Sequence, residues 1–265
     1  MNHRAKKSLG QHFLNDKNMI AKIIRAIDIN ENDNVLEIGP GEGALTHGLL
    51  KSGCKLTCLE LDTDLANKWK DMAKDHPRFK CIECDAVAED WAPYLPVNKC
   101  VGNIPYNISR PLIYKLFQYR KQITKTVFMV QKEFAEKLTA QAGEDAYGIL
   151  SVLSACFADV EYLFNIPPTV FYPPPKVTSA CVRITFKELE INDALFIEVV
   201  QTAFNQRRKT LKNSLKSYYR SELEDKFPWG KRAQEITPEE YIEFVEYLTQ
   251  SNKKRASHKG TKYPK

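Results

Sequence analysis

Hydrophobic positions follow two patterns in turn over residues 16–157. Short apolar runs, typical of buried strands, lie at residues 34–38, 55–60, 79–83, 98–102 and 126–130. Stretches with apolar residues three or four positions apart, typical of helices, lie at residues 16–28, 44–51, 63–74, 111–119, 131–142 and 147–157. Because strands and helices alternate, we expect a parallel sheet covered by helices on both faces.

The pattern changes after residue 157. Two strand-like runs, 159–165 and 178–186, flank a proline-rich loop, and we expect them to add antiparallel strands to one edge of the sheet. From residue 192 onward the spacing is helical, and it predicts helices at 193–204, 207–220 and 238–250.

These patterns divide the chain into three parts. We expect an α/β domain over residues 1–188 and a small α-helical domain over residues 189–250. The last stretch, residues 251–265, holds six Lys or Arg and no acid, which predicts a disordered basic tail.

The composition indicates the cellular compartment of the protein and the kind of partner it binds. The 265 residues are 43% hydrophobic, enough for a sizeable core, and no apolar run is long enough to cross a bilayer. The N-terminus lacks the apolar stretch of a secretory signal, and the seven cysteines are odd in number, so we expect free thiols in a cytoplasmic protein. A net charge of +6 favours an anionic partner, although an ordinary, slightly basic enzyme fits it equally well.

Cys81 and Cys84 form the one C-x-x-C pair worth testing as a metal site. They lie three apart on a predicted strand, so their sulfurs point to opposite faces and cannot easily bind one ion. No second pair with zinc spacing follows, and we predict no metal site.

A glycine-rich segment follows the first predicted strand, in the run VLEIGPGEG. Glycines allow a tight turn and close approach of a ligand, and the next helix offers free N–H groups. In NAD- and FAD-binding loops the third glycine comes three residues after the second, whereas Gly43 comes two after Gly41. With Glu37 two residues before Gly39, the pattern resembles the S-adenosylmethionine-dependent methyltransferases. A glycine-rich turn without a ligand is the alternative.

Two acids close neighbouring predicted strands. Glu60 ends the second strand, where a carboxylate can accept hydrogen bonds from ribose hydroxyls. Asp85 follows the third strand and can accept a hydrogen bond from an adenine amino group, or simply cap the segment after it. Since the carboxyl ends of parallel strands share one edge, both acids are expected beside the glycines.

The fourth strand ends in an unusual corner, Asn-Ile-Pro-Tyr. The N6 amine of adenine is a poor nucleophile, and two fixed acceptors, the Asn103 side-chain oxygen and the Ile104 carbonyl, can hold its hydrogens and direct its lone pair. Pro105 stiffens the corner, and Tyr106 offers a face for the base. We therefore assign catalysis to Asn103, Pro105 and Tyr106, mostly through orientation, with a purely structural turn as the alternative.

This corner resembles the motif of N6-adenine methyltransferases. The DNA-modifying form usually has a second proline where Ile104 stands, and the chain is similar instead to the ribosomal RNA adenine dimethyltransferases. Further matches to that family lie at residues 8–16, 171–179 and 203–214, and together they cover residues 8–250. The last of them resembles the branch that acts on small-subunit (16S) RNA.

The resemblance implies an α/β Rossmann-like fold, S-adenosylmethionine as cofactor, and double methylation of two neighbouring adenosines near the 3′ end of small-subunit RNA. With the glycine loop, it assigns the cofactor site to His12, Leu14, Gly39, Gly41, Glu60, Asp85 and Asn103. Position 12, often Asn in the family, is His here, and a backbone contact with the cofactor suits either residue.

Two surfaces are candidates for RNA. Residues 205–221 hold six Lys or Arg and no acid, and the spacing places Arg208, Lys212 and Lys216 on one helical stripe opposite an apolar face that includes Leu211 and Leu215. We assign substrate contacts to Arg207, Arg208 and Lys212, against the alternative of a solvated helix face.

Aromatic side chains are the second candidate for contact with the RNA. Phe171 is either a second aromatic wall for an extruded base, opposite Tyr106, or a core residue under the proline-rich loop.

Three functions remain open at this point. We expect a monomeric enzyme that dimethylates small-subunit RNA and takes part in ribosome biogenesis. A resistance-type enzyme acting on large-subunit RNA is the second possibility, although residues 203–214 argue against it. The third is a protein that binds RNA or the ribosome on the same fold without catalysis.

Overall fold

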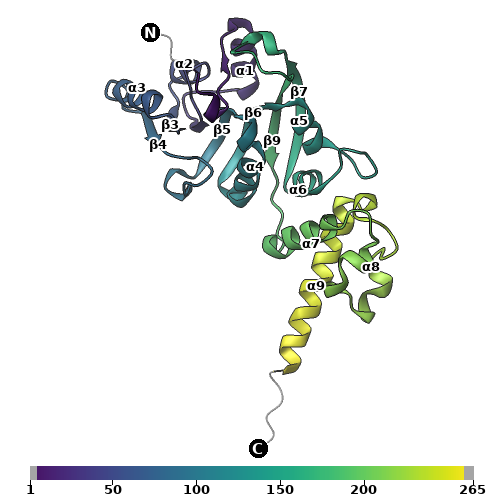
Figure 1. Cartoon of the computed structure of the whole chain (residues 1–265). Helices are drawn as coiled ribbons and strands as arrows, with labels where there is room; N and C mark the ends of the chain where they lie inside the picture. The colour runs from purple at the N-terminus through teal and green to yellow at the C-terminus, as the bar shows by residue number, and fades with distance from the viewer. Residues whose placement is uncertain (1–4, 260–265) are drawn as a thin grey trace, which may run out of the picture. The chain divides into compact units, whose positions relative to one another are not determined.

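The computed structural model describes residues 5–259 and divides the chain into two compact units. The first unit comprises Met1–Glu136 and Asp159–Phe186, and the second comprises Lys137–Ala158 and Lys187–Lys265 (Figure 1). The predicted domain boundary at residue 188 is therefore incomplete, because residues 137–158 belong to the second unit. The helix Ile149–Phe157 is apolar on all sides, and its Phe157 packs on Phe196 of the second unit with ring centres 5.4 Å apart.

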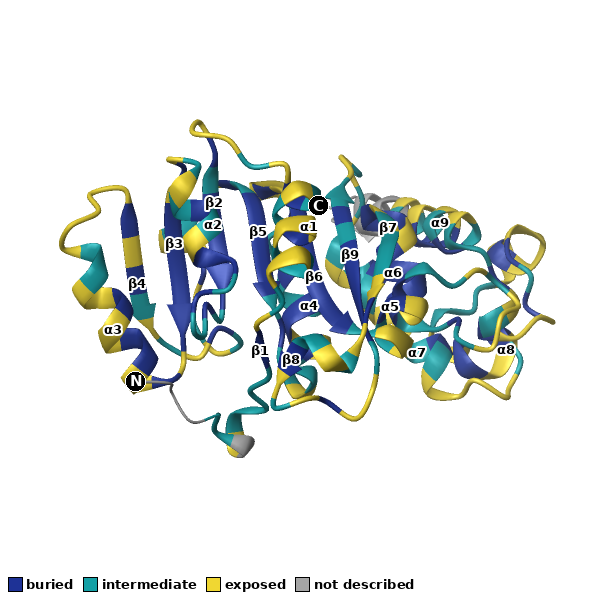
Figure 2. Ribbon diagram, turned by 90° about the horizontal axis from the view of Figure 1, so that it is seen from above, coloured by how far each residue is buried: buried dark blue, intermediate teal, exposed yellow. Residues whose placement is uncertain are grey.

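The first unit is built on a seven-stranded sheet in the order β4-β3-β2-β5-β6-β9-β7. Figure 2 shows these strands side by side, with most of the central ones buried. Their bounds are β2 Asn34–Ile38, β3 Lys55–Glu60, β4 Phe79–Glu83, β5 Val97–Asn103, β6 Ile123–Gln131, β7 Ala158–Ile166 and β9 Ser179–Phe186. Strands β2 to β6 are parallel to their neighbours and β9 is antiparallel to β6, so the predicted α/β sheet with late strands at one edge is confirmed.

The predicted helices of this unit are also present. Their bounds are α1 Lys17–Ile27, α2 Thr46–Lys51, α3 Thr63–Ala73, α4 Ser109–Gln118 and α5 Lys132–Thr139, the last of which runs into the second unit. Asp16 caps α1, since its Oδ1 accepts the Met19 N–H at 2.7 Å. Short 3-10 turns lie at Lys7–Leu9, Ala92–Tyr94, Tyr106–Ile108, Arg120–Gln122 and Pro168–Val170.

Strand register brings the carboxyl ends of three strands together. Ile38 at the end of β2 pairs with Leu59 of β3 on one side and with Gly102 of β5 on the other. Glu60 at the end of β3, Asn103 at the end of β5 and the glycine segment after β2 therefore lie at one edge of the sheet.

A small second sheet was not predicted. Strand β1, Phe13–Leu14, pairs antiparallel with β8, Phe171–Tyr172, so that Phe13 faces Tyr172 and Leu14 faces Phe171. Neighbouring residues on a strand point to opposite sides. Phe171 is accordingly buried, with 4% of its surface exposed, while Tyr172 is 68% exposed.

The second unit is helical, as predicted, but one of its helices is broken. Its helices are α6 Ile149–Phe157, α7 Asp193–Asn205, α8 Leu211–Ser214 and α9 Pro238–Lys259, with 3-10 turns at Lys216–Tyr218, Ser221–Lys226 and Ala233–Glu235. The predicted helix over residues 207–220 is wrong. The backbone N–H groups of Leu211 and Lys212 donate to the carbonyls of Lys231 and Trp229, and Thr210 forms a β-bridge with Arg232, so this segment pairs with residues 229–232 instead of starting a helix at 207.

The predicted tail also begins later than expected. Helix α9 runs to Lys259, so the prediction of disorder from residue 251 is wrong up to that point, and residues 260–265 lie outside the described residues. Once a helix is formed, each added residue contributes a further hydrogen bond, and the Lys, Arg and Ala residues here are good helix formers.

Two further features concern the chain as a whole. All seven cysteines are free thiols, and six of them are buried. Among residues 5–259, no helix is both long and apolar enough to span a membrane.

Candidate active site

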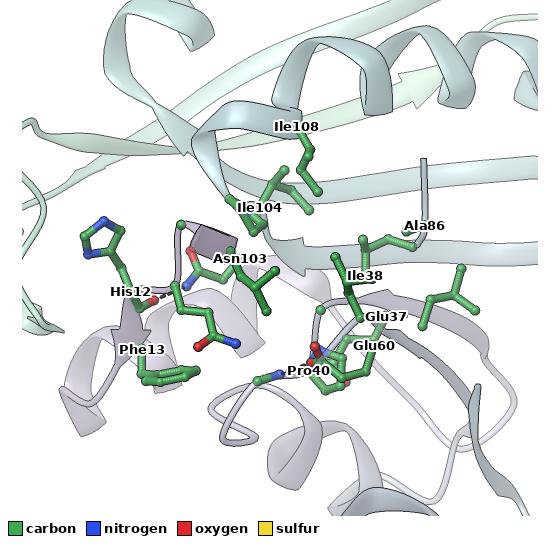
Figure 3. A pocket seen from close by; sticks show the side chains of 18 of the residues that line it. His12, Phe13, Glu37, Ile38, Pro40, Glu60, Ala86, Asn103, Ile104 and Ile108 are labelled. Atoms are coloured by element: carbon green, nitrogen blue, oxygen red, sulfur yellow. Dashed lines mark hydrogen bonds between the residues drawn. The ribbon is translucent and has the colours of Figure 1, made fainter. Parts of the chain in front are cut away.

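A cavity of about 260 Å³ opens at the carboxyl ends of β2, β3 and β5 (Figure 3). Its walls come from residues 8–14, 37–42, 44–45, 59–61, 84–86 and 103–108. Every residue assigned from the sequence to cofactor binding lies in these walls: His12, Leu14, Gly39, Gly41, Glu60, Asp85 and Asn103. The structure thus brings together side chains that are up to 91 positions apart in the chain, such as His12 and Asn103.

The glycine loop fits tightly against aromatic side chains. A Cβ on Gly41 would lie 3.2 Å from the Phe13 ring, and one on Gly43, where φ is +96°, would lie 2.4 Å from the Trp69 ring. Trp69 also donates from Nε1 to the Gly41 carbonyl oxygen at 2.9 Å. No sequence pattern singled out Trp69, yet this side chain packs on the loop and binds its backbone.

The Glu60 carboxylate accepts hydrogen bonds from the backbone of this loop and from that of the segment after β3. Its Oε2 accepts the Gly41 N–H at 3.0 Å, and its Oε1 accepts the Asp62 N–H at 2.9 Å. Burial raises the pKa of this carboxyl, and the two backbone donors act against the shift. Each carboxylate oxygen can accept a second hydrogen bond, so Glu60 keeps capacity for a ligand hydroxyl.

Glu37 is a second acid of the cavity and is almost completely buried, with 1% of its surface exposed. Burial, with a further contribution from the nearby Glu60, raises the pKa of Glu37 to about 7. The Cys58 thiol donates to its Oε2 at 3.3 Å. The sequence identified Glu37 as part of the glycine pattern but gave no sign of this perturbed pKa.

Asp85 lies at the exposed side of the cavity. Its Oδ1 accepts the Val87 N–H at 2.8 Å, a bond of the capping kind that the sequence raised as an alternative. One carboxylate oxygen is engaged in this way, and the group still faces the cavity.

The Asn-Ile-Pro-Tyr corner turns sharply out of β5. Asn103 is the last residue of the strand, and its Nδ2 donates to the His12 carbonyl oxygen at 2.8 Å. Ile104 is buried, and its N–H is bound to the Met129 carbonyl oxygen at 3.1 Å. Figure 3 shows Asn103 beside His12, on the opposite side of the cavity from Glu60 and Pro40.

Tyr106 is fixed at its hydroxyl, which forms a 2.7 Å hydrogen bond with Oγ of the buried Ser179 on β9. Its ring stacks on that of His12, with centres 5.8 Å apart and planes inclined by 28°. His12 is held in turn by a 2.7 Å hydrogen bond between Nδ1 and the Pro173 carbonyl oxygen. A carbonyl only accepts, so Nδ1 carries the hydrogen.

The N-terminal segment forms one wall of the cavity and is anchored at Asp62. Lys6 Nζ lies 2.7 Å from Asp62 Oδ1 and 2.8 Å from Asp64 Oδ2, and Gln11 donates to Asp62 Oδ2 at 2.9 Å. Burial alone would raise the pKa of Asp62, but the hydrogen bonds from Lys6 and Gln11 outweigh it and lower the pKa to about 2. Nothing in the sequence pointed to this anchor.

Phe171, expected from the sequence either as a base-stacking wall or as a core residue, is buried. Its side chain packs in the core cluster of the first unit with Leu14 and Phe13, and it is absent from the described walls of the cavity. This packing is that of a core residue under the proline-rich loop, and the role in base stacking stays a prediction.

The basic residues proposed to contact RNA lie in the second unit. Arg207 donates to Gln234 Oε1 at 2.7 Å and to the Asp145 carbonyl oxygen at 3.2 Å, whereas Lys212 lies 3.1 Å from Glu224 Oε1. Arg208 is exposed. Only Lys212 of the predicted stripe lies in α8, so the continuous helical stripe is wrong, although Leu211 and Leu215 are buried as expected.

A glycine loop after β2 and an Asn-Ile-Pro-Tyr corner after β5, facing one cavity on this sheet, are the arrangement of the Rossmann-like S-adenosylmethionine-dependent methyltransferases. The protein is of that class. Residues 2–250 match the model of the family described as Ribosomal RNA adenine dimethylase, and the chain belongs to this family. The resemblance inferred from the motifs is confirmed.

The names of individual relatives agree with this family assignment. The chain is 41% identical over 255 residues to the Ribosomal RNA small subunit methyltransferase A of Legionella pneumophila (strain Corby), covering 94% of this chain and all of that one. It is 47% identical over 221 residues to the protein of the same name from Pseudomonas aeruginosa, covering 81% and 82%.

Solved structures extend the comparison to the fold. A dimethyladenosine transferase from Plasmodium falciparum superimposes with a TM-score of 0.79 at 27% identity, covering 91% of this chain and 98% of that one. The 23S rRNA methyltransferase ErmE gives a TM-score of 0.69 at 26% identity, covering 90% and 100%. The proteins similar to this chain therefore include ones named for either ribosomal subunit.

Proposed function

We propose that this protein transfers methyl groups from S-adenosylmethionine to the N6 amines of two adjacent adenosines near the 3′ end of small-subunit (16S) ribosomal RNA, each twice. The names of the relatives at 41% and 47% identity support the small subunit as substrate. We further propose that it acts as a monomer in the cytoplasm, as a step in the biogenesis of the small subunit.

The walls of the cavity fit the cofactor. S-adenosylmethionine supplies an activated methyl group on its sulfonium. Glu60 has oxygens to accept hydrogen bonds from ribose hydroxyls, and Asp85 faces the same cavity for an adenine amino group. Gly39 and Gly41 let the backbone approach, and His12 and Leu14 close the cavity from the N-terminal side.

One observation carries the catalytic role of the corner. Because Asn103 Nδ2 is bound to the His12 carbonyl oxygen, Oδ1 is the atom of the amide left to accept a hydrogen from the adenine amine. With the Ile104 carbonyl as a second acceptor, both amine hydrogens are held and the lone pair points away from them. Catalysis then consists mainly of orientation, with Tyr106 supplying a face for the base.

Contacts with the rest of the RNA are assigned to the second unit. Arg207, Arg208 and Lys212 are exposed there, in a chain with a net charge of +6. Cations at such positions neutralise phosphates and make binding weaker as salt rises. Lys212 forms an ion pair with Glu224, which offsets part of its positive charge. We therefore expect the two arginines to contribute more to RNA binding than the lysine.

The test uses small subunits from a strain that lacks this methyltransferase. They are incubated with the protein and labelled S-adenosylmethionine, and the nucleosides of the digested RNA are separated by mass. The proposal predicts dimethyladenosine in small-subunit RNA, and its absence with the Asn103→Ala variant.

Two other outcomes of that assay contradict the proposal in different ways. Label in large-subunit RNA instead would favour the alternative of a resistance-type enzyme; the similar structure named as a 23S rRNA methyltransferase acts, by its name, on that subunit. Binding to subunits without any methyl transfer would make it a non-catalytic RNA-binding protein.

A further inference from the structure

Lys115 joins helix α4 to a distant segment of the chain. It lies in the last turn of α4 and is half-buried. Its Nζ donates to the Val87 carbonyl oxygen at 2.8 Å and to the Glu89 carbonyl oxygen. Both acceptors lie in the segment between β4 and β5, and the proposed methyl transfer gives Lys115 no role.

The two residues that Lys115 binds are also the two that hold Asp85. The Val87 N–H donates to Asp85 Oδ1 at 2.8 Å, and the Glu89 N–H donates to the Asp85 carbonyl oxygen at 2.8 Å. The side chain and the backbone of Asp85 are thus each bound by a residue whose own carbonyl binds Lys115. Asp85 is exposed at the wall of the cavity, so these bonds, and not burial, set its position.

We propose that Lys115 is a positioning residue for Asp85. By holding the turn, it fixes the Asp85 carboxylate where it can accept a hydrogen bond from the adenine amino group of the cofactor. The inference rests on the proposed function, since the adenine contact of Asp85 is part of it. It adds the side chain that keeps this contact in place.

An ammonium group suits this task. It carries three hydrogens, enough for both carbonyl oxygens, and hydrogen bonds from a charged donor are stronger than those from a neutral one. Burial lowers the pKa of Lys115. The carboxylates of Asp90, Glu89 and Asp85 act against this shift and so favour the ammonium form.

The same segment has a second attachment that does not involve Lys115. The buried Trp91 donates from Nε1 to the Ala86 carbonyl oxygen at 2.9 Å, and its backbone N–H donates to the hydroxyl of Tyr119, directly after α4, at 3.3 Å. The Trp91 and Tyr119 rings stack with centres 5.9 Å apart and planes inclined by 14°. Loss of the Lys115 ammonium should therefore loosen residues 85–89 without unfolding α4.

Lys115→Met is the test variant, because it keeps a long side chain and donates no hydrogen bond. A lysine near the end of a helix also interacts favourably with the helix dipole, which is an effect unrelated to Asp85. Lys51→Met controls for it, since Lys51 lies in the last turn of α2, is exposed and is outside the described walls of the cavity.

The first readout is the Kd for two ligands, measured by calorimetry beside the melting temperature. One is S-adenosylhomocysteine, and the other is its analogue with hydrogen in place of the purine amino group. We expect Lys115→Met to bind S-adenosylhomocysteine about fivefold more weakly than wild type and the analogue within about twofold of wild type. Lys51→Met should bind both ligands as wild type does.

Three results of this measurement would overturn the inference. Equal weakening for both ligands would mean that Lys115 supports the cavity in general and not the amino contact. Unchanged binding of both would mean that Asp85 is placed without Lys115. A wild type that does not distinguish the two ligands would remove the contact that Lys115 is proposed to position.

The second readout is a double-mutant cycle with Asp85→Ala. Because Lys115 acts through Asp85, the double variant should bind S-adenosylhomocysteine no more weakly than Asp85→Ala alone, whereas multiplied losses would contradict the inference. Lys115→Gln, whose polar end falls one bond short of the position of Nζ, replaces Lys115→Met in both measurements if the latter does not fold, and the same pattern is expected.

These measurements use no RNA and so separate the inference from the proposed function. A wild type that prefers the ligand with the amino group, and loses this preference with Lys115→Met, would support the inference even if it methylated neither subunit. That failure to methylate would count against the proposed function alone. Methylation of small subunits by a protein whose preference survives Lys115→Met would count against the inference alone.

Discussion

The side-chain amide of Asn103 donates from Nδ2 to the backbone oxygen of His12 at 2.8 Å, and this bond decides which end of the amide faces the cavity. An acid of the same shape has no N–H to offer. Asn103→Asp therefore sets a carboxylate oxygen against a carbonyl oxygen and displaces the remaining acceptor.

For Asn103→Asp we expect methyl transfer to fall by about 100-fold or more, because a displacement of about 1 Å is enough for such a loss. The rate is measured at saturating cofactor and subunit, beside the melting temperature. Asn165→Asp, at an exposed position on β7, is the control and should behave as wild type. An Asn103→Asp enzyme with wild-type turnover would show that the orientation of the amide is irrelevant.

The hydrogen bond between Tyr106 and Ser179 calls for a double-mutant cycle. Tyr106→Phe and Ser179→Ala each break a bond at a buried site, and each should lower the free energy of unfolding by about 1 kcal/mol. The double variant should lose little more than either one, which is a coupling of about 1 kcal/mol. Urea unfolding measures all four proteins, and strict additivity would show that the two hydroxyls do not stabilise each other.

The raised pKa of Glu37 predicts that the stability of the fold depends on pH. Its pKa is raised to about 7 in the folded protein from a usual value of 4.5, so the unfolded chain releases this proton first. The contribution to stability is therefore complete below pH 4.5 and is lost as the pH rises toward 7.

The check on Glu37 is the Glu37→Gln variant, which has a neutral group of the same size. The difference in unfolding free energy between wild type and variant should shift in favour of the variant between pH 4.5 and 7, then level off. Urea unfolding at several pH values measures it. A difference that does not change with pH would mean that the carboxyl titrates alike in both states.

The lowered pKa of Asp62 predicts the opposite pH dependence, a loss of stability in acid. Its folded pKa of about 2 lies below the usual 3.8, so its stabilising effect is present above pH 3.8 and is lost as the pH falls toward 2. Lys6→Ala removes one of the groups that lower this pKa, and acid unfolding should then begin at a higher pH. Because the anchored segment lines the cavity, the amides of residues 11–14 should also exchange with solvent faster.

Lys74→Ala is the matched control for Lys6→Ala. Lys74 forms an exposed ion pair with Asp71, at 2.8 Å, away from the cavity walls that the structure describes. Pairs of this kind contribute little, so acid unfolding and hydrogen exchange should stay as in wild type. Equal effects of the two substitutions would show that Lys6 contributes only as one more surface charge.

The part of the fold with regular periodicity could be predicted from the sequence. Strands β2, β3 and β4 have the bounds that the apolar runs indicate, because each is a short buried segment between turns. From a parallel sheet it follows that Glu60 and Asn103 meet at one edge, although they are 43 positions apart. That the residues we propose for cofactor binding line one cavity was therefore accessible to sequence reasoning.

What the sequence could not supply depends on pairing between distant segments. Whether Phe171 or Tyr172 points inward is set by the pairing of β8 with β1, and neither strand is long enough to show a period. The anchor between Lys6 and Asp62 joins residues 56 positions apart through single side chains. The helix expected over residues 207–220 fails for the same reason, since its backbone pairs with residues 229–232.

The pairing of β1 with β8 also sets an order of events during synthesis. Residues 8–14 leave the ribosome early, but the segment that holds β1 and the Nδ1 of His12 in place, residues 171–173, follows almost 160 positions later. A growing chain that has completed strands β2 to β5 still lacks one fixed wall of its cavity. The cavity that we propose for the cofactor is therefore complete only after about two thirds of the chain has been translated, so cofactor binding there cannot nucleate the first unit.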